Sequence, residues 1–201
     1  MDEGAHVISM SWTIDSSGPE IGELKDIIHE ADTSKILMFC AFSDQGNTHG
    51  KNCMPASCPE TIVIGAATGW AYPCTWVDSS QVDYLCPGEH ILIDRHAKPG
   101  STPKSGSSIA TALAAGLGAL LLHLTQLVMP DRYDHLRNHT VMRAALQKMA
   151  GPNKYIHVQQ HFHFSFQEDV FWSWDASGQE KLRELVSGLV VCSSFLPVSL
   201  Y

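Results

Sequence analysis

A run of 21 residues without a charged side chain, Ile109–Met129, limits what this chain can fold into. Such a run is long enough to cross a membrane, so a membrane span is one alternative. The run also contains Gly116, Gly118 and His123, and its first half is rich in alanine. We therefore interpret it as a helix, from Ser107 to about Leu127, that is buried in the core of a soluble domain.

Three apolar segments upstream of this helix predict a buried parallel sheet. An amphipathic helix over residues 19–31 separates the first two, because apolar side chains recur there at helical spacing. The rhythm of strand, helix and strand is typical of α/β proteins in which helices cover a mainly parallel sheet. The expected buried strands are His6–Trp12, Ile36–Phe42 and Thr61–Ala67, and weaker strand candidates are Val82–Leu85 and His90–Ile93.

The C-terminal part of the chain divides into a long helix and an appendage. Arg132–Ala150 has helical spacing of apolar residues and ends at a Gly-Pro pair. Residues 157–166 then alternate between aromatic and polar side chains, which favours a half-buried strand with the histidines facing outward. A further helix is expected around Gln179–Leu189. We therefore expect a main domain over residues 1–150 and a strand/helix extension over 151–201 packed on it.

The charge balance and the cysteines set broad limits on partners and compartment. The chain has 13 basic and 21 acidic residues and a net charge of -8, with no basic run, which argues against nucleic-acid binding. Its first residues lack the cationic and apolar regions of a secretory signal, so we expect its six cysteines to stay reduced. These features favour the cytoplasm over secretion and leave the compartment open.

Cofactor and metal sites find little support in the sequence. No glycine-rich dinucleotide motif follows any expected strand, so we expect no cofactor. His157, His161 and His163 could surround a metal, but the alternating aromatics around them favour an ordinary strand instead. His49, Cys53 and Cys58 are a poor match to zinc-ligand spacing. We expect no metal site.

The chemically informative stretch is Ser105–Gly116, where a turn of small residues runs directly into the apolar helix. A serine at such a junction has its hydroxyl beside unpaired helix N–H groups and the positive end of the helix dipole. That position suits a nucleophile that passes through an oxyanion. The simpler alternative is that Ser107 or Ser108 serves only as a helix cap.

The wider sequence resembles the subtilisin-like serine proteases, the subtilase family. Their nucleophile motif, Gly-Thr-Ser-Met-Ala-[Ser/Thr]-Pro-His-Val-Ala-Gly, is similar to residues 106–116 and corresponds to Ser108 as the nucleophile. Ordered matches upstream support the resemblance, which covers roughly residues 5–150 and looks most like fungal members. These matches are Val7–Ser11 with Val-Ile-Asn-Met-Ser, Cys40–Gly46 with Ala-Ala-Ala-Gly-Asn-Glu-Gly, Ile62–Ala66 with the Val-Gly-Ala strand, and Leu85–Gly88 with Met-Ala-Pro-Gly.

The resemblance implies a fold, an activity and a set of site residues. The fold is the C-terminal part of a three-layer subtilisin-like α/β domain, with its N-terminal part missing. The activity is serine endopeptidase cleavage of a polypeptide substrate through an acyl-enzyme on Ser108. Ser11, Trp12 and Thr13 would lie along the edge that pairs with the substrate, and Thr13 in place of a small glycine predicts a narrower cleft.

Asp44 departs from the family pattern at the oxyanion position. The family carries an asparagine there, and loss of that hydrogen-bond donor in subtilisin costs about 10²–10³ in turnover. A charged carboxylate cannot donate a hydrogen bond, so Asp44 could serve only when protonated. The kexin-like branch of the family also carries aspartate here, so this change alone does not imply inactivity.

The catalytic Asp and His of the family have no counterpart in this sequence. Both belong upstream of the segment that starts here at His6, and His49-Gly50 follows Asp44, in the wrong order. A serine without a general base is an ordinary alcohol. We therefore expect a truncated form that is inactive alone and whose partner is the missing N-terminal segment. The alternative is a degenerate subtilase that acts as a binding or regulatory module.

Overall fold

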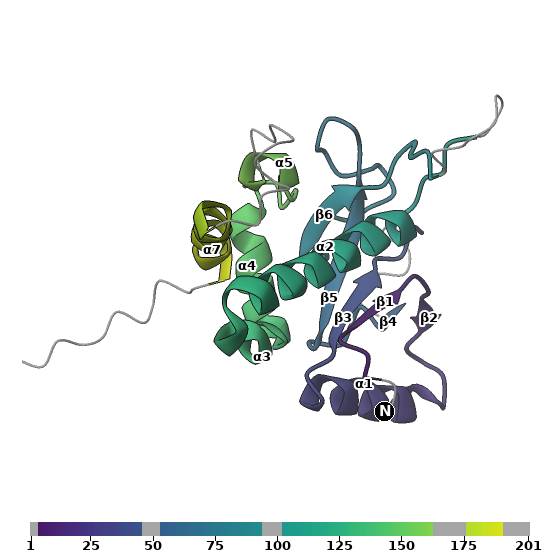
Figure 1. The fold of residues 1–201 in the computed structure, drawn as a ribbon. Coiled ribbons are helices and arrows are strands. Elements are labelled where there is room, and N and C mark those ends of the chain that lie inside the picture. The colour runs from purple at the N-terminus through teal and green to yellow at the C-terminus, as the bar shows by residue number, and fades with distance from the viewer. Residues whose placement is uncertain (1–3, 46–52, 94–101, 163–175, 191–201) are drawn as a thin grey trace, which may run out of the picture.

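The computed structural model describes residues 4–45, 53–93, 102–162 and 176–190. Its centre is a four-stranded sheet in the order β1-β3-β5-β6, in which every neighbouring pair is parallel (Figure 1). This arrangement, with helices against the sheet, confirms the expected α/β class. The strands are β1 (Val7–Met10), β3 (Leu37–Ala41), β5 (Thr61–Ala67) and β6 (Tyr84–Pro87).

The two central strands follow directly from their sequence. Every residue of β3 and of β5 is buried, which explains why both read as continuous apolar runs rather than alternating ones. Strand β6 begins two residues later than the expected Val82–Leu85. The expected strand His90–Ile93 is wrong, because only an isolated bridge between Ile91 and Lys104 forms there.

A second, two-stranded sheet lies outside the segments that were expected to form strands. Strand β2 (Ile14–Asp15) pairs antiparallel with β4 (Cys53–Met54). Each strand has two residues, too few to leave a periodic pattern. The pairing ties the segment after β1 to the segment before β5.

Helix α2 (Ser107–Val128) organises the core by crossing all four strands of the main sheet (Figure 1). It is long and apolar enough to span a membrane by length and composition, but half of its most apolar window is buried inside the domain. The expectation of a helix in the core is confirmed for that side alone. The other side is open to solvent, and Leu113, Leu120 and Leu127 on it are 47%, 42% and 48% exposed.

Close packing between α2 and the sheet depends on a glycine. A Cβ placed on Gly118 would lie 2.6 Å from Cζ of Phe39, a fully buried ring on β3. No real Cβ approaches another heavy atom so closely, so a side chain at this position would push the helix away from the sheet. Gly116, one half-turn earlier on the same helix, has no heavy atom within 4 Å of such a Cβ.

The remaining helices surround this unit. Helix α1 (Ile21–Thr33) contacts β3, and it matches the expected helix within two residues at each end. The single helix expected over Arg132–Ala150 is wrong. It is divided into η3 (Pro130–Arg132), α3 (Tyr133–Leu136) and α4 (His139–Met149). The break has a clear cause, because the side chain of Asn138 accepts hydrogen bonds from two N–H groups of the first turn of α4 and so caps it.

The segment after residue 151 also differs from expectation. Val158–His161 forms a short helix, α5, so the strand expected from residue 157 is wrong over its described part. His163 and the rest of that strand lie outside the described residues. Helix α7 (Ala176–Val190) confirms the expected final helix and packs on α2 and α4. The division into a main domain and an extension at residue 151 stays a prediction.

Substituting the two glycines of α2 tests how the helix rests on the sheet. Gly118→Ala should lower the free energy of unfolding by about 1–3 kcal/mol through overpacking against Phe39. Gly116→Ala, the matched control, should raise it by up to about 1 kcal/mol through helix propensity alone. Urea unfolding of both variants measures the difference. Equal effects of the two substitutions would contradict the packing described here.

The open face of α2 and the open edge at β1 predict poor solubility for the chain expressed alone. In the described part of the chain, no strand pairs with the outer side of β1, so its backbone groups are a template for association. Replacing Leu113, Leu120 and Leu127 together by glutamine should reduce association, as measured by light scattering and sedimentation. A monomeric, cooperatively unfolding parent chain would contradict this prediction.

Candidate active site

The N-terminus of α2 presents two serines with different surroundings. Ser107 is fully buried, and its Oγ accepts a hydrogen bond from the N–H of Ala66 on β5 at 3.1 Å. Its carbonyl oxygen accepts from the hydroxyl of Thr111 at 2.8 Å. Ser108 is exposed instead. The first serine therefore anchors the helix to the sheet, and the second faces solvent.

Asp44 caps this helix from a distant part of the chain. It follows β3 by three residues, and its Oδ1 and Oδ2 accept from the N–H of Ser107 at 3.2 and 3.0 Å. The cap residue by position is Gly106, which has no side chain to do so. The alternative that a serine hydroxyl caps the helix is therefore wrong for this geometry. A negative group at a helix N-terminus is also favoured by the helix dipole.

Gly106 brings Asp44 and Ser108 together. Its φ of 150° and ψ of 153° lie in a region that essentially only glycine adopts. A Cβ on Gly106 would lie 3.2 Å from Oδ2 of Asp44 and 3.3 Å from Oγ of Ser108. Both side chains therefore border the same point, and a Cβ at this position would require them to shift slightly.

A cleft of about 260 Å³ brings together the five site residues that the family resemblance predicted. Three chain segments form it: the stretch after β1, the end of β3 with the residues that follow, and the start of α2. The hydroxyl of Ser11 donates to the carbonyl oxygen of Ser108 at 3.2 Å and links the first segment to the third. The lining residues are Ser11, Trp12, Thr13, Ala41, Phe42, Ser43, Asp44, Gln45 and Ser108.

The site has a candidate nucleophile but no visible base. Within the described ranges, no histidine hydrogen-bonds to Oγ of Ser108, and no group of three or more metal-ligating side chains comes together. Asp44 is exposed and acts as an acceptor toward Ser107, so it does not occupy the donor role of an oxyanion hole here. The start of α2 thus places the Ser108 hydroxyl beside a helix N-terminus whose Ser107 N–H is bonded to Asp44.

Cysteine chemistry does not replace the serine in the described part of the chain. Cys40, Cys58, Cys74 and Cys86 are free thiols and are buried, and Cys53 is buried as well. Burial raises the pKa of both Cys40 and Cys86 to about 12. Such thiols stay protonated at neutral pH, and a protonated thiol is a poor nucleophile.

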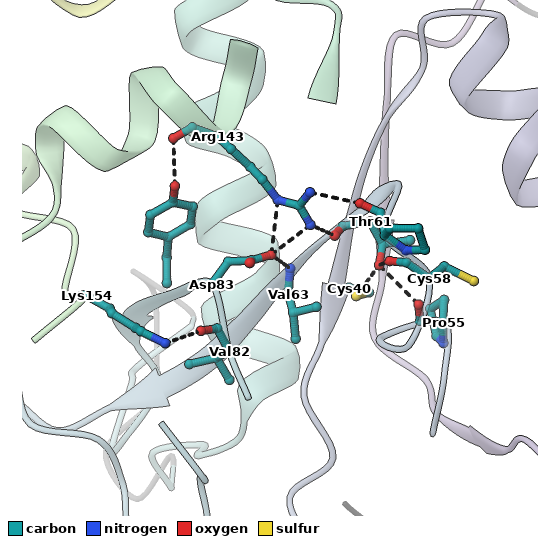
Figure 2. A network of polar contacts seen from close by, with 11 residues as sticks. Cys40, Pro55, Cys58, Thr61, Val63, Val82, Asp83, Arg143 and Lys154 are labelled. Atoms are coloured by element: carbon teal, nitrogen blue, oxygen red, sulfur yellow. Dashed lines mark hydrogen bonds and ion pairs between the residues drawn. The ribbon is translucent and has the colours of Figure 1, made fainter. Parts of the chain in front are cut away.

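A polar network around Arg143 holds the turn before β5, and sequence reasoning missed it (Figure 2). The guanidinium of Arg143 on α4 donates to the Asp83 carboxylate at 3.0 Å from Nη2, to the carbonyl of Pro59 at 2.8 Å, and to the carbonyl of Thr61. The hydroxyl of Thr61 is within 3.0 Å of the carbonyls of Pro55 and Cys58. The network thereby fixes the turn that precedes β5.

Comparison with known proteins identifies the architecture. The sequence model of the subtilase family matches residues 1–166. The chain belongs to the subtilase family. An intracellular serine protease of Paenibacillus polymyxa is 30% identical over 164 residues, which cover 75% of this chain and 48% of that protein. The chain therefore spans about half the length of the curated relative it matches.

Solved structures of the same architecture agree with this subtilase assignment. The prenylagaramide maturation protease PagA is 26% identical with a TM-score of 0.57, over 74% of this chain and 53% of that one. The PatG macrocyclase in complex with peptide is 28% identical with a TM-score of 0.58, over 74% and 44%. The self-cleaved protease domain of PatA is 28% identical with a TM-score of 0.58, over 75% and 56%.

Adding a methyl group at Gly106 of this subtilase site should destabilise the protein more than adding a methyl group to a glycine on an open loop. Gly106→Ala should cost about 1–3 kcal/mol of unfolding free energy, because alanine is strained at that φ and crowds Asp44 and Ser108. Gly69→Ala is the control, since no heavy atom lies within 4 Å of a Cβ there. Thermal unfolding compares the two. A Gly106→Ala protein as stable as the control would contradict the turn geometry.

Proposed function

We propose that this chain carries the nucleophile half of a serine endopeptidase that cleaves a polypeptide substrate. The observation that supports the proposal is the cleft that gathers Ser108, Asp44 and the segment 11–13 at the N-terminus of α2. Ser108 Oγ would attack the scissile carbonyl and form an acyl-enzyme, and the helix N-terminus would stabilise the oxyanion. Ser11, Trp12 and Thr13 would border the substrate backbone along the cleft.

The proton acceptor would come from a segment that this sequence does not contain. In subtilases an Asp and a His complete the triad, and no described residue takes either role beside Ser108. Two features support an additional segment of the same domain: the outer edge of β1, on which no described strand pairs, and the exposed apolar side of α2. The segment would add a strand to the edge and cover the leucines, and it would bring the base to Ser108.

Asp44 would then have a structural role. With the substrate absent, its carboxylate accepts hydrogen bonds from the N–H of Ser107 and caps α2. Membership of a fungal branch stays a prediction without support from the relatives described, since the curated one is bacterial.

A second candidate function is a binding or regulatory module without catalysis. The observation that favours it is the carboxylate at the oxyanion position, which accepts from the N–H of Ser107 instead of offering a donor. Such a module would hold a peptide in the same cleft and release it uncut.

Hydrolysis of a fluorogenic peptide library separates the two candidates. If the gene upstream of Met1 encodes the Asp and His motifs, the extended chain should hydrolyse peptides, and Ser108→Ala should reduce turnover by about 10³-fold or more. Asp44→Asn, the matched variant in the oxyanion region, should keep or raise the rate, because the side-chain amide of asparagine carries N–H groups that can donate to the oxyanion.

One result would count against the enzyme, and another against the role proposed for Asp44. An extended chain that contains both motifs but hydrolyses no peptide would support the binding module. A fall of about 10²-fold or more in turnover for Asp44→Asn would show that the carboxylate itself is required, and would overturn the role proposed for it.

A further inference from the structure

The turn between α3 and α4 carries an asparagine in an acceptor sequence for N-linked sugars. Residues 138–140 read Asn-His-Thr, which fits the pattern Asn-x-Ser/Thr with a middle residue other than proline. The other three asparagines of the chain, Asn47, Asn52 and Asn153, have no serine or threonine two residues later. Such a short pattern also arises by chance, so the geometry of the turn decides whether Asn138 is suited to carry a sugar.

The turn presents the two required residues to solvent. Asn138 and Thr140 are both exposed. The side chain of His139 between them is only 19% exposed, and its Nδ1 lies 2.6 Å from Oδ1 of Asp32 on α1. Because this contact holds the middle residue against the protein, the residues on either side of it stay on the surface, where a bulky sugar can be accommodated.

The two ends of the Asn138 amide are available for different tasks. Its Oδ1 accepts hydrogen bonds from the N–H groups of Thr140 at 3.0 Å and Val141 at 3.3 Å, and so caps α4. Both partners are donors, so the atom that faces them is the oxygen and the amide nitrogen is left over. Within the described ranges, Nδ2 of Asn138 donates no hydrogen bond. An N-linked sugar is attached to this nitrogen, so the sugar and the helix cap use different atoms.

Asn138 lies near the end of α2 that is opposite to the Ser108 cleft. Helix α2 begins at Ser107 and has 22 residues, which makes it about 33 Å long. The short helices η3 and α3, which precede Asn138, follow the C-terminal end of α2 and contact it (Figure 1). A sugar on Asn138 would therefore project from the surface without covering the cleft. The inference does not rest on the proposed function.

We propose that Asn138 accepts an N-linked oligosaccharide when the chain enters a secretory compartment. The donor is a lipid-diphosphate-linked oligosaccharide. Nδ2 of Asn138 attacks the anomeric carbon of the first sugar, and the new C–N bond forms as the C–O bond to the diphosphate breaks. The lipid diphosphate leaves with the bonding electron pair, and one amide proton passes to a base of the transferase. The product keeps Oδ1, so the cap of α4 is retained.

Expression in a eukaryotic host tests the acceptor directly. The 201-residue chain is fused to a cleavable secretory leader and to a C-terminal Asn-Gly-Thr tag, whose own glycosylation reports that the chain has entered the compartment. Whole-cell extract is treated with a peptide N-glycosidase, which releases the sugar and leaves aspartate, and mass spectrometry locates the change. We expect a sugar on Asn138 as well as on the tag. A chain that is glycosylated on the tag alone would overturn the proposal.

Matched variants separate the acceptor nitrogen from the helix cap. Asn138→Asp keeps a side-chain oxygen for the cap but has no amide nitrogen, so the electrophoretic shift from this position should be lost. Thr140→Ala removes the hydroxyl that the acceptor pattern requires and should lose the shift as well, whereas Thr140→Ser should keep it. A sugar on Asn138 that persists in Thr140→Ala would contradict the assignment of residues 138–140 as the acceptor sequence.

Thermal unfolding tests whether the sugar and the cap coexist. The glycosylated chain should unfold at the same temperature as Asn138→Asp or higher, because both retain the oxygen that caps α4. Asn138→Ala loses that oxygen and should unfold at a lower temperature than either. A glycosylated chain that unfolds at as low a temperature as Asn138→Ala would show that the sugar breaks the cap, and would overturn the separation of tasks between the two amide atoms.

Discussion

The packing of helix α2 against the parallel sheet is the contact on which the rest of the structure depends. Gly118 allows the helix to lie against the ring of Phe39, and Ser107 ties its first turn to Ala66 at the centre of the sheet. With these two points fixed, the next residue, Ser108, faces the cleft beside Asp44. The candidate nucleophile is therefore placed by core packing, so a change in the core would move it even if no cleft residue were altered.

The same geometry gives Asp44 a structural task that a family comparison alone does not reveal. Its carboxylate satisfies an N–H at the start of a long apolar helix, which a glycine at the cap position cannot do. An asparagine could take this bond through its oxygen and still keep its amide hydrogens for a substrate. In this chain the aspartate accepts hydrogen bonds from the N–H of Ser107, and this is the physical basis for weighing a binding module against an enzyme.

Elements that depend on local pattern could be predicted from the sequence, and those that depend on distant partners could not. β3, β5 and α2 are long apolar runs, so their positions were predicted within about two residues. The β2–β4 pair joins residues far apart in the chain, and Asn138 interrupts an otherwise helical pattern. Ser108 and Asp44 emerged from motif resemblance, whereas the bonds from Arg143 to Asp83 and Pro59 join residues that are far apart in the chain.

The reactivity of the Ser108 hydroxyl in this chain is the most direct test of whether a base lies beside it. A fluorophosphonate probe reacts only with a serine whose proton can be removed by a neighbouring base. Treating the 201-residue chain with the probe and mapping the modified peptide by mass spectrometry should show Ser108 unlabelled. If the gene upstream of Met1 encodes the Asp and His motifs, the extended chain should be labelled at Ser108. Labelling of Ser108 in the chain alone would contradict the account, because a base would then have to lie within these 201 residues.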